Sequence, residues 1–295
     1  MDRRRFLLSS GAAAAAPLVF GAPLPEGARA PRLKKAVKLD MVQGGDLRAR
    51  FARLAKLGFD GVEASRPGPE PVEDLLAASR EAGVPIHGVV NSAHWSKPFS
   101  HAKESVRAEG RAAMETALRD AKALGADSVL LVPGIVNAGV AYDDCYRRSQ
   151  AEIRRVLPLA KELGVRILLE NVWNNFLLSP MEAARYIDEL ESPLVGAYFD
   201  IGNVVRYGWP EQWIRILGRR IGKLDVKEYS RKKQTEEGIW KGFAVEIGDG
   251  DCGWPAVLAA LADIGYEGWA TAEVAGGDEA RLADIKRRMD LVLGR

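Results

Sequence analysis

Residues 160–171 read AKELGVRILLEN, which places the end of a helix, a glycine and a strand in direct succession. Gly164 is typical of a helix C-terminus, because glycine accepts the left-handed backbone that closes the last turn. The apolar run Ile167–Leu169 that follows does not alternate with polar residues, as expected of a strand buried on both faces. Residues 121–133, AKALGADSVLLVP, repeat this order. Both stretches predict buried strands that are entered from helices.

The same alternation of short apolar runs and helix-period stretches extends along the rest of the chain. The strands are expected at Ala36–Val42, Gly61–Ser65, Ile86–Val90, Ser128–Pro133, Arg166–Asn171, Val195–Asp200, Ile221–Glu228 and Gly268–Val274. The helices are expected at Asp46–Leu57, Val72–Ala82, Lys103–Leu124, Tyr142–Leu163, Pro180–Leu190, Pro210–Leu217, Trp254–Ile264 and Glu279–Leu293. Such alternation indicates parallel strands joined by crossover helices. Eight units predict an α/β fold of one domain, a (β/α)8 or TIM barrel over residues 31–295.

Composition excludes several classes of protein. The 295 residues are 47% apolar and 28% charged and include two Cys, which argues against collagen-like, disordered and disulfide-stapled chains. Forty-two basic and 40 acidic residues leave a net charge of +2. This balance offers no electrostatic argument for a nucleic-acid partner.

The first thirty residues have the order of an export signal. Arg3, Arg4 and Arg5 precede the uncharged run Leu7–Phe20, and small residues follow as far as Ala30. We therefore expect residues 1–30 to be a twin-arginine-type signal peptide that directs the protein to the periplasm or another extracytoplasmic location. The apolar run is too short for a membrane-spanning helix, so no stable membrane anchor is expected. Without residues 1–30 the chain carries 38 basic and 38 acidic residues.

Carboxylates close or interrupt four consecutive expected strands, namely Glu170, Asp200, Asp225 and Glu273. The functional groups of such a barrel lie at the carboxyl ends of its strands, so these side chains should meet at one rim. An unpaired buried charge is costly, and a shared divalent cation would offset that cost. Oxygen ligands favour one Mn2+ or Mg2+ ion, with Co2+ and Zn2+ as alternatives.

The alternative is a set of acids at the barrel mouth that pair with Lys227 and Arg231. Four carboxylates around a divalent ion would also leave a net charge of about −2, which needs compensation. Lys227, Arg231, a protonated acid or a second metal could each provide it. The sequence leaves this choice open.

Three motifs resemble one family over Lys38 to Gly294. They are Leu169–Trp173 (LENVW), Asp200–Asn203 (DIGN) and Gly265–Trp269 (GYEGW). These motifs resemble the xylose isomerase-like barrel superfamily of sugar (phosphate) isomerases and epimerases. The DIGN form is similar to that of L-ribulose/L-xylulose-5-phosphate 3-epimerases, whereas ketose 3-epimerases usually have His where Asn203 stands.

The resemblance implies roles for individual residues. It makes Glu170 and Glu273 metal ligands and the two catalytic acid/base groups, and Asp200 a third ligand. Asp225 stands where the family has a histidine ligand, which leaves the metal and the reaction open. Arg231 matches an arginine that contacts substrate in the related ketose 3-epimerases.

Further residues are expected to line a sugar pocket: Asn203, Lys227, His94, Trp95 and Trp173. The alternative for the two tryptophans is that they only fill space at the barrel mouth. We expect His87 to be a core residue and His101 a surface residue. The segment Ser230–Gly253 is expected to be the longest stretch without secondary structure, and such loops are usually functional or mobile.

These residues together predict a metal-dependent sugar isomerase or epimerase. It would act on a small-molecule keto sugar by removing the proton on the carbon next to the carbonyl. One alternative is an exported metal-dependent lyase or hydrolase of 3-keto-glycosides, the lyase acting by β-elimination. Another is a sugar-binding barrel without catalysis. A homo-oligomer is left open.

Overall fold

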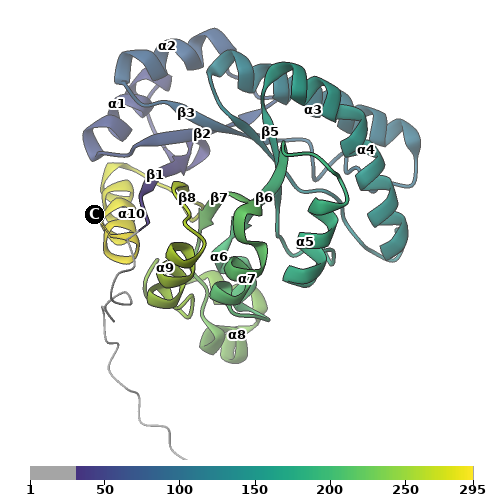
Figure 1. The fold of residues 1–295 in the computed structure, drawn as a ribbon. Helices are drawn as coiled ribbons and strands as arrows, with labels where there is room; N and C mark the ends of the chain where they lie inside the picture. The colour runs from purple at the N-terminus through teal and green to yellow at the C-terminus, as the bar shows by residue number, and fades with distance from the viewer. Residues whose placement is uncertain (1–30, 295) are drawn as a thin grey trace, which may run out of the picture.

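Eight parallel strands form a closed barrel in this computed structural model, which describes residues 31–294 (Figure 1). Neighbours in sequence pair with each other, and β1 closes the barrel by pairing with β8 as well as β2. The strands are β1 (Leu33–Lys38), β2 (Gly61–Arg66), β3 (Ile86–Asn91), β4 (Ser128–Leu131), β5 (Arg166–Glu170), β6 (Val195–Asp200), β7 (Ile221–Val226) and β8 (Gly268–Ala272). The predicted TIM barrel of one domain is confirmed. The expected signal peptide, residues 1–30, lies outside the described residues.

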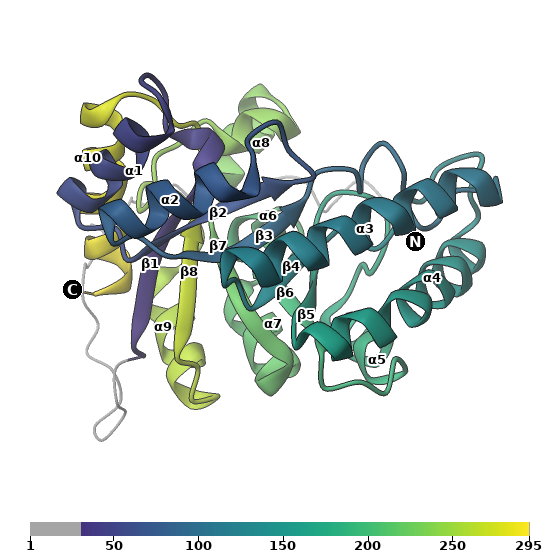
Figure 2. The same cartoon turned by 90° about the horizontal axis from the view of Figure 1, so that it is seen from above.

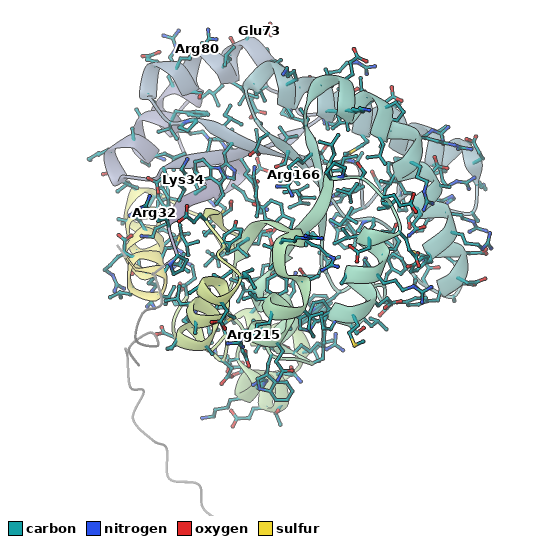
Figure 3. All side chains as sticks on the ribbon, viewed as in Figure 1. Arg32, Lys34, Glu73, Arg80, Arg166 and Arg215 are labelled. Atoms are coloured by element: carbon teal, nitrogen blue, oxygen red, sulfur yellow. The ribbon has the colours of Figure 1, made fainter. Side chains whose placement is uncertain are left out.

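Helices surround the barrel and connect successive strands (Figures 1 and 2). They are α1 (Leu47–Leu57), α2 (Val72–Ala82), α3 (Glu104–Leu124), α4 (Tyr142–Leu163), α5 (Pro180–Asp188), α6 (Ile201–Val205), α7 (Pro210–Leu217), α8 (Arg231–Glu237), α9 (Trp254–Asp263) and α10 (Glu279–Leu293). Charged residues lie on their outer faces, as Glu73 and Arg80 of α2 show in Figure 3. Within residues 31–294, none of the helices has the length and apolarity needed to cross a membrane.

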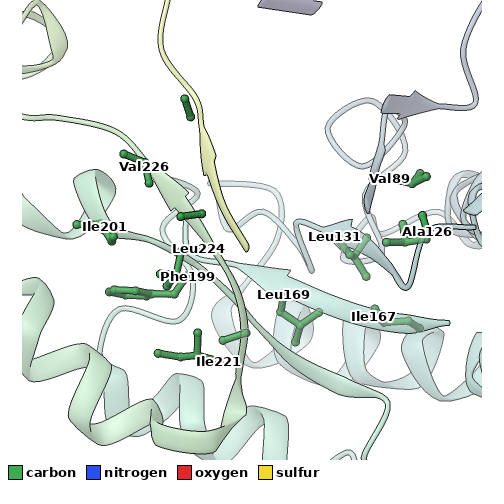
Figure 4. Close-up of a cluster of buried hydrophobic side chains, with 14 of the residues drawn as sticks. Val89, Ala126, Leu131, Ile167, Leu169, Phe199, Ile201, Ile221, Leu224 and Val226 are labelled. Atoms are coloured by element: carbon green, nitrogen blue, oxygen red, sulfur yellow. The ribbon is translucent and has the colours of Figure 1, made fainter. Parts of the chain in front are cut away.

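The alternation of side chains along each strand separates the core from the barrel interior. In β5, Ile167 and Leu169 pack in the layer between the sheet and the helices (Figure 4). Leu168 instead joins a small cluster inside the barrel with Leu130 and Tyr198. Glu170 follows Leu168 by two residues and therefore shares its inward direction.

Glycine ends four of the predicted helices. Gly58, Gly83, Gly125 and Gly164 follow α1 to α4 with left-handed φ values between +67° and +77°. The backbone N–H of each returns to carbonyls of the last helical turn. Each helix thus stops at a defined residue, and the strand that follows begins at a defined place.

The expected strand Ala36–Val42 was wrong at both ends. The strand begins at Leu33 and ends at Lys38, and a 3-10 helix follows at Leu39–Met41. Leu39 and Met41 are buried in this turn. Hydrophobicity therefore continues past the strand, so the apolar pattern could not mark where pairing with β2 stops.

The expected structureless segment Ser230–Gly253 was also wrong. It contains α8 and a 3-10 helix at Ile239–Phe243. The Ser230 hydroxyl caps α8 by accepting a hydrogen bond from the Lys233 N–H at 3.3 Å. Because α8 buries none of its residues, it has no apolar stripe that a search for helical periodicity could detect.

Glu228 anchors the end of this segment to the barrel. One carboxylate oxygen accepts the N–H groups of Tyr229 and Cys252 at 3.2 and 3.1 Å. The other accepts the Gly248 N–H and the Trp254 indole N–H, both at 2.8 Å. A buried carboxylate that accepts four hydrogen bonds is a strong local constraint, because each bond is charge-assisted.

We predict that Glu228→Gln will destabilise the protein by about 2–4 kcal/mol. The glutamine amide would direct an NH2 group at N–H donors and would lose the negative charge that they share. Urea unfolding followed by circular dichroism measures the loss. Glu236→Gln, on the exposed face of α8, is the control; equal stability of the two variants would contradict this role.

Candidate active site

Four carboxylates meet at the carboxyl end of the barrel. Glu170, Asp200, Asp225 and Glu273 each offer an oxygen, and these four oxygens lie within 4.8 Å of one another. We call this group the acid centre. Glu170 and Asp200 end β5 and β6, Asp225 lies in β7, and Glu273 directly follows β8. Asp200 and Asp225 are direct register partners. Asp200 and Asp225 are fully buried, and Glu170 is nearly so.

Two lysines compensate part of this negative charge. The ammonium of Lys227 lies 2.9 Å from Asp200 Oδ2 and 2.6 Å from Glu273 Oε2. The ammonium of Lys38 lies 3.1 Å from Asp225 Oδ2 and 3.8 Å from Glu273 Oε1. Lys227 was among the counter-charges expected from the sequence, and Lys38 was not. β1 reads LKKAVK, so Lys38 is one of three lysines in the strand, and neither its type nor its spacing set it apart.

Arg231 has no part in this compensation. Its guanidinium donates to the carbonyls of Val205 and Gly208 at 3.0 and 2.7 Å and lies over the Trp209 ring at 5.1 Å. It thus fastens the start of α8 to the connection between α6 and α7. Arg231 is not among the residues that line the cavity described below, and a contact with substrate stays a prediction.

A second polar layer lies below the acid centre, inside the barrel. Glu63 is fully buried, 3.4 Å from the Lys38 ammonium. The Tyr198 hydroxyl donates to Thr271 Oγ1 at 2.9 Å, and Thr271 Oγ1 lies 3.3 Å from His87 Nε2. His87 also stacks on Trp269 with ring centroids 4.0 Å apart, in agreement with its predicted place in the core. The floor of the site is therefore polar and tightly connected.

Burial and charge separate the pKa values of the two glutamates. Burial raises the pKa of Glu170 well above its usual range, and the nearby Glu273 carboxylate raises it further. Burial also acts to raise the pKa of Glu273, but Lys38 and Lys227 outweigh it and lower that pKa to about 2. Glu170 therefore favours the protonated form and Glu273 the ionised form.

The acid centre fits a divalent cation. Asp225 Oδ1 is buried and accepts no hydrogen bond from any of residues 31–294. Burial raises the pKa of Asp225, and the neighbouring carboxylates add to this effect, so the charge of the centre is not fully balanced. A bound divalent ion would give Asp225 Oδ1 a partner and would add the missing positive charge. Oxygen ligands suit hard ions. The choice of Mn2+ or Mg2+ over other ions stays a prediction.

A cavity of about 970 Å³ opens above the acid centre. Five expected substrate-binding residues line it: His94, Trp95, Trp173, Asn203 and Lys227. Further lining residues that the sequence analysis missed include Lys38, Asp40, Ser65, Trp240, Phe243, Glu246 and Arg281. The structure thus brings Glu170, Glu273 and five of the six expected binding residues to the lining of one cavity.

Hydrogen bonds orient several of these residues. His94 Nδ1 accepts the Val132 N–H at 3.2 Å, which leaves the ring hydrogen on Nε2. The Trp173 indole N–H donates to the Asn203 carbonyl at 2.9 Å, and the Asn203 amide donates to the Asn171 carbonyl at 3.0 Å. The walls of the cavity are therefore held in place by the barrel rim.

The fold and the site define a class of protein: (β/α)8 barrels with a carboxylate centre at the carboxyl ends of strands five to eight. Within this class, the sequence family described as xylose isomerase-like TIM barrel matches residues 51–292, so the chain belongs to that family.

Relatives with assigned activities differ in the reaction. The chain is 27% identical over 221 residues to a putative L-ribulose-5-phosphate 3-epimerase of Escherichia coli K12, covering 73% of this chain and 72% of the relative. It is 24% identical over 249 residues to an inosose dehydratase of Clostridium perfringens, covering 76% and 80%. The structure of a 3-keto-D-glucoside 4-epimerase from E. coli superimposes with a TM-score of 0.72 at 15% identity, covering 88% of this chain and 99% of that one.

We predict that Lys38→Met will destabilise the metal-free protein by about 3–5 kcal/mol, because it leaves buried carboxylates without a counter-charge. Added Mn2+ should raise the melting temperature of this variant more than that of the wild type, since the ion supplies the missing positive charge. Scanning calorimetry in EDTA and in Mn2+ makes the comparison. Lys232→Met, on the exposed side of α8, is the control. Equal Mn2+ shifts in Lys38→Met and wild type would contradict the assignment.

A second prediction concerns pH and stability. Burial, with a smaller effect of Lys38, lowers the pKa of His94 from 6.5 to about 4. Between these values the unfolded chain binds the proton and the folded chain does not. The free energy of unfolding should therefore fall as the pH falls from 6.5 towards 4, with a His94 share of about 2–3 kcal/mol.

Urea unfolding of His94→Gln at pH 4 to 7 tests the contribution of His94 to the pH dependence of the free energy of unfolding. His101→Gln, outside the cavity, is the control. We expect a flatter pH profile for the His94 variant alone. Parallel profiles for wild type and both variants would contradict the prediction.

Proposed function

We propose that the protein is a divalent-metal-dependent epimerase or isomerase of keto sugars that removes the proton next to the carbonyl. The observation that supports this proposal most is geometric: Glu170 and Glu273 belong to one group of four carboxylates whose oxygens lie within 4.8 Å of one another, and both line the same cavity. In the metal-free centre, burial raises the pKa of Glu170, whereas Lys38 and Lys227 lower that of Glu273. When two titratable groups of one site have pKa values that are pushed apart, one can act as base and the other as acid.

Glu273 is the base in this proposal. Lys38 and Lys227 keep its carboxylate ionised, with a pKa of about 2 before substrate binds. Glu170 is the acid in this proposal, and burial in the metal-free centre favours its protonated form. The two residues come from β8 and β5, which β6 and β7 separate, so they can approach a bound sugar from different sides. Proton return to the same carbon from the other face inverts it, and return to the adjacent carbon isomerises the sugar.

The lysines stabilise the negative charge that develops during proton removal. Lys227 and Lys38 both line the cavity; Lys227 already contacts two acids of the acid centre, and Lys38 contacts two of them and Glu63. A divalent ion held by Glu170, Asp200, Asp225 and Glu273 would supply Lewis-acid polarisation of the carbonyl. The fixed ammonium groups add positive charge in a partly desolvated site, where it acts strongly.

The relatives support removal of the α-proton as the first step. They do not decide which step follows it. Epimerisation next to a carbonyl and loss of a β-substituent both begin with removal of the α-proton. The dehydratase among the relatives favours β-elimination as the second candidate, a metal-dependent lyase. With a 3-keto-glycoside, the group lost could be the aglycone, and hydrolytic release belongs to the same alternative. Export through residues 1–30 and homo-oligomer formation remain proposals from the sequence.

We predict that Glu170→Gln and Glu273→Gln will each reduce turnover at least about a thousandfold while the fold is retained. Glu246→Gln is the matched control, because Glu246 also lines the cavity but pairs with Arg281 at 2.6 Å. Proton NMR in D2O with Mn2+-loaded enzyme, D-fructose, L-ribulose and methyl 3-keto-glucoside measures deuterium incorporation, inversion and methanol release.

Exchange with inversion supports the epimerase, and release of methanol supports the lyase or hydrolase. Undiminished exchange in either glutamine variant would exclude the proposed acid/base pair. Binding of these sugars without exchange in any of the proteins would favour the non-catalytic sugar-binding barrel.

A further inference from the structure

Aromatic side chains form one wall of the cavity. We call Trp173, Trp240 and Phe243 the aromatic wall. The centroids of Trp173 and Trp240 are 5.0 Å apart, and those of Trp173 and Phe243 are 4.8 Å apart. Trp240 is 68% exposed although its ring packs against that of Trp173. An exposed indole beside a cavity indicates a surface that is covered by a ligand.

The aromatic wall is rigidly supported from below. The buried Tyr229 ring packs against Trp173 and Phe243, with centroid distances of 5.6 and 4.8 Å. Its hydroxyl lies 2.8 Å from the Ile239 carbonyl, which precedes Trp240. Gly242 lies so close that an added Cβ would meet the Tyr229 ring at 2.3 Å. A platform that is held in place before binding loses little side-chain entropy when a ligand stacks on it.

The aromatic wall begins at the acid centre and leads away from it. The Lys227 ammonium, which contacts Glu273 at 2.6 Å, lies 5.5 Å from the Phe243 centroid. The exposed Trp240 is the outer end of the wall. A sugar ring that reacts between Glu170 and Glu273 would therefore leave Trp240 free for a second group.

The size of the cavity agrees with such a second group. At about 970 Å³ it lies at the upper end of the range of roughly 300–1,000 Å³ for small-molecule sites, which is more space than one sugar ring fills. Asp40, Ser65 and Ser92 provide hydroxyl and carboxylate groups elsewhere in its lining. One apolar wall and polar groups elsewhere suit a pyranose ring, which has an apolar C–H face and hydroxyls at its edge.

We propose that the aromatic wall is a subsite for a second sugar ring, so that the substrate is a glycoside in which a keto sugar is linked to another pyranose. The keto ring lies at the acid centre, and the second ring stacks on Trp240. This inference rests on the proposed function for the reacting ring. The binding of the second ring does not depend on turnover and can be tested separately.

The first experiment measures binding of methyl glycosides, which have no free carbonyl and cannot react by removal of an α-proton. Isothermal titration calorimetry compares the methyl glycosides of glucose and cellobiose. We expect wild type to bind methyl cellobioside more tightly than methyl glucoside, and Trp240→Ala to weaken methyl cellobioside binding roughly 3- to 10-fold without changing methyl glucoside binding. Trp209→Ala is the matched control, because Trp209 is 54% exposed but is not among the residues that line the cavity. Trp240→Phe should retain most of the preference.

The second experiment measures turnover. Trp240→Ala should raise KM for a 3-keto-disaccharide and leave kcat/KM for a free ketose unchanged. If no sugar is turned over while the methyl cellobioside preference depends on Trp240, the proposed function fails and the subsite stands. Equal methyl cellobioside binding by wild type and Trp240→Ala would overturn the subsite. Dimerisation that Trp240→Ala abolishes, without any preference for methyl cellobioside, would overturn it in favour of a contact between copies of the chain.

Discussion

The concentration of buried carboxylates inside the barrel is the constraint on which the site depends. Side chains alternate along each strand, so Glu170, Asp200 and Asp225 must point inward when their apolar neighbours face the helices. Barrel closure then places them within a few ångströms of Glu273. Like charges in a desolvated space repel strongly, and the structure can hold them only with cations close by.

Lys38 and Lys227 do not balance the four carboxylates equally. The pKa values of the two glutamates differ as a result. Glu273 lies near both ammonium groups and stays ionised, whereas Glu170 is buried beside Glu273 and holds its proton. Asp225 keeps one oxygen without a donor among residues 31–294. The result, without a bound ion, is one ionised carboxylate, one carboxyl that favours its protonated form and one carboxylate oxygen without a donor at the floor of a large cavity.

The segment after β7 shows that local sequence patterns do not predict the role of every residue. Glu228 follows Lys227 directly and lies three residues after Asp225. Its carboxylate nevertheless accepts hydrogen bonds from four N–H groups and has a structural role. Arg231, the next charged residue, binds backbone carbonyls outside the cavity. Trp240 stands in a stretch without apolar periodicity, but the 3-10 helix and Tyr229 bring it to the cavity wall. Residue type and spacing did not separate these roles, because each depends on partners distant in sequence.

Sequence by itself determined the eightfold alternation, the glycine helix ends, and the four acids that lie at or near the ends of strands five to eight. These features follow from local backbone preferences and from a strand period of two, which act over a few residues. Only the tertiary structure decided that Lys38 from β1 neutralises Asp225 from β7, that Arg231 lies elsewhere, and that a polar segment builds an aromatic wall. Those outcomes depend on distances between residues far apart in the chain, and closure of the barrel sets these distances.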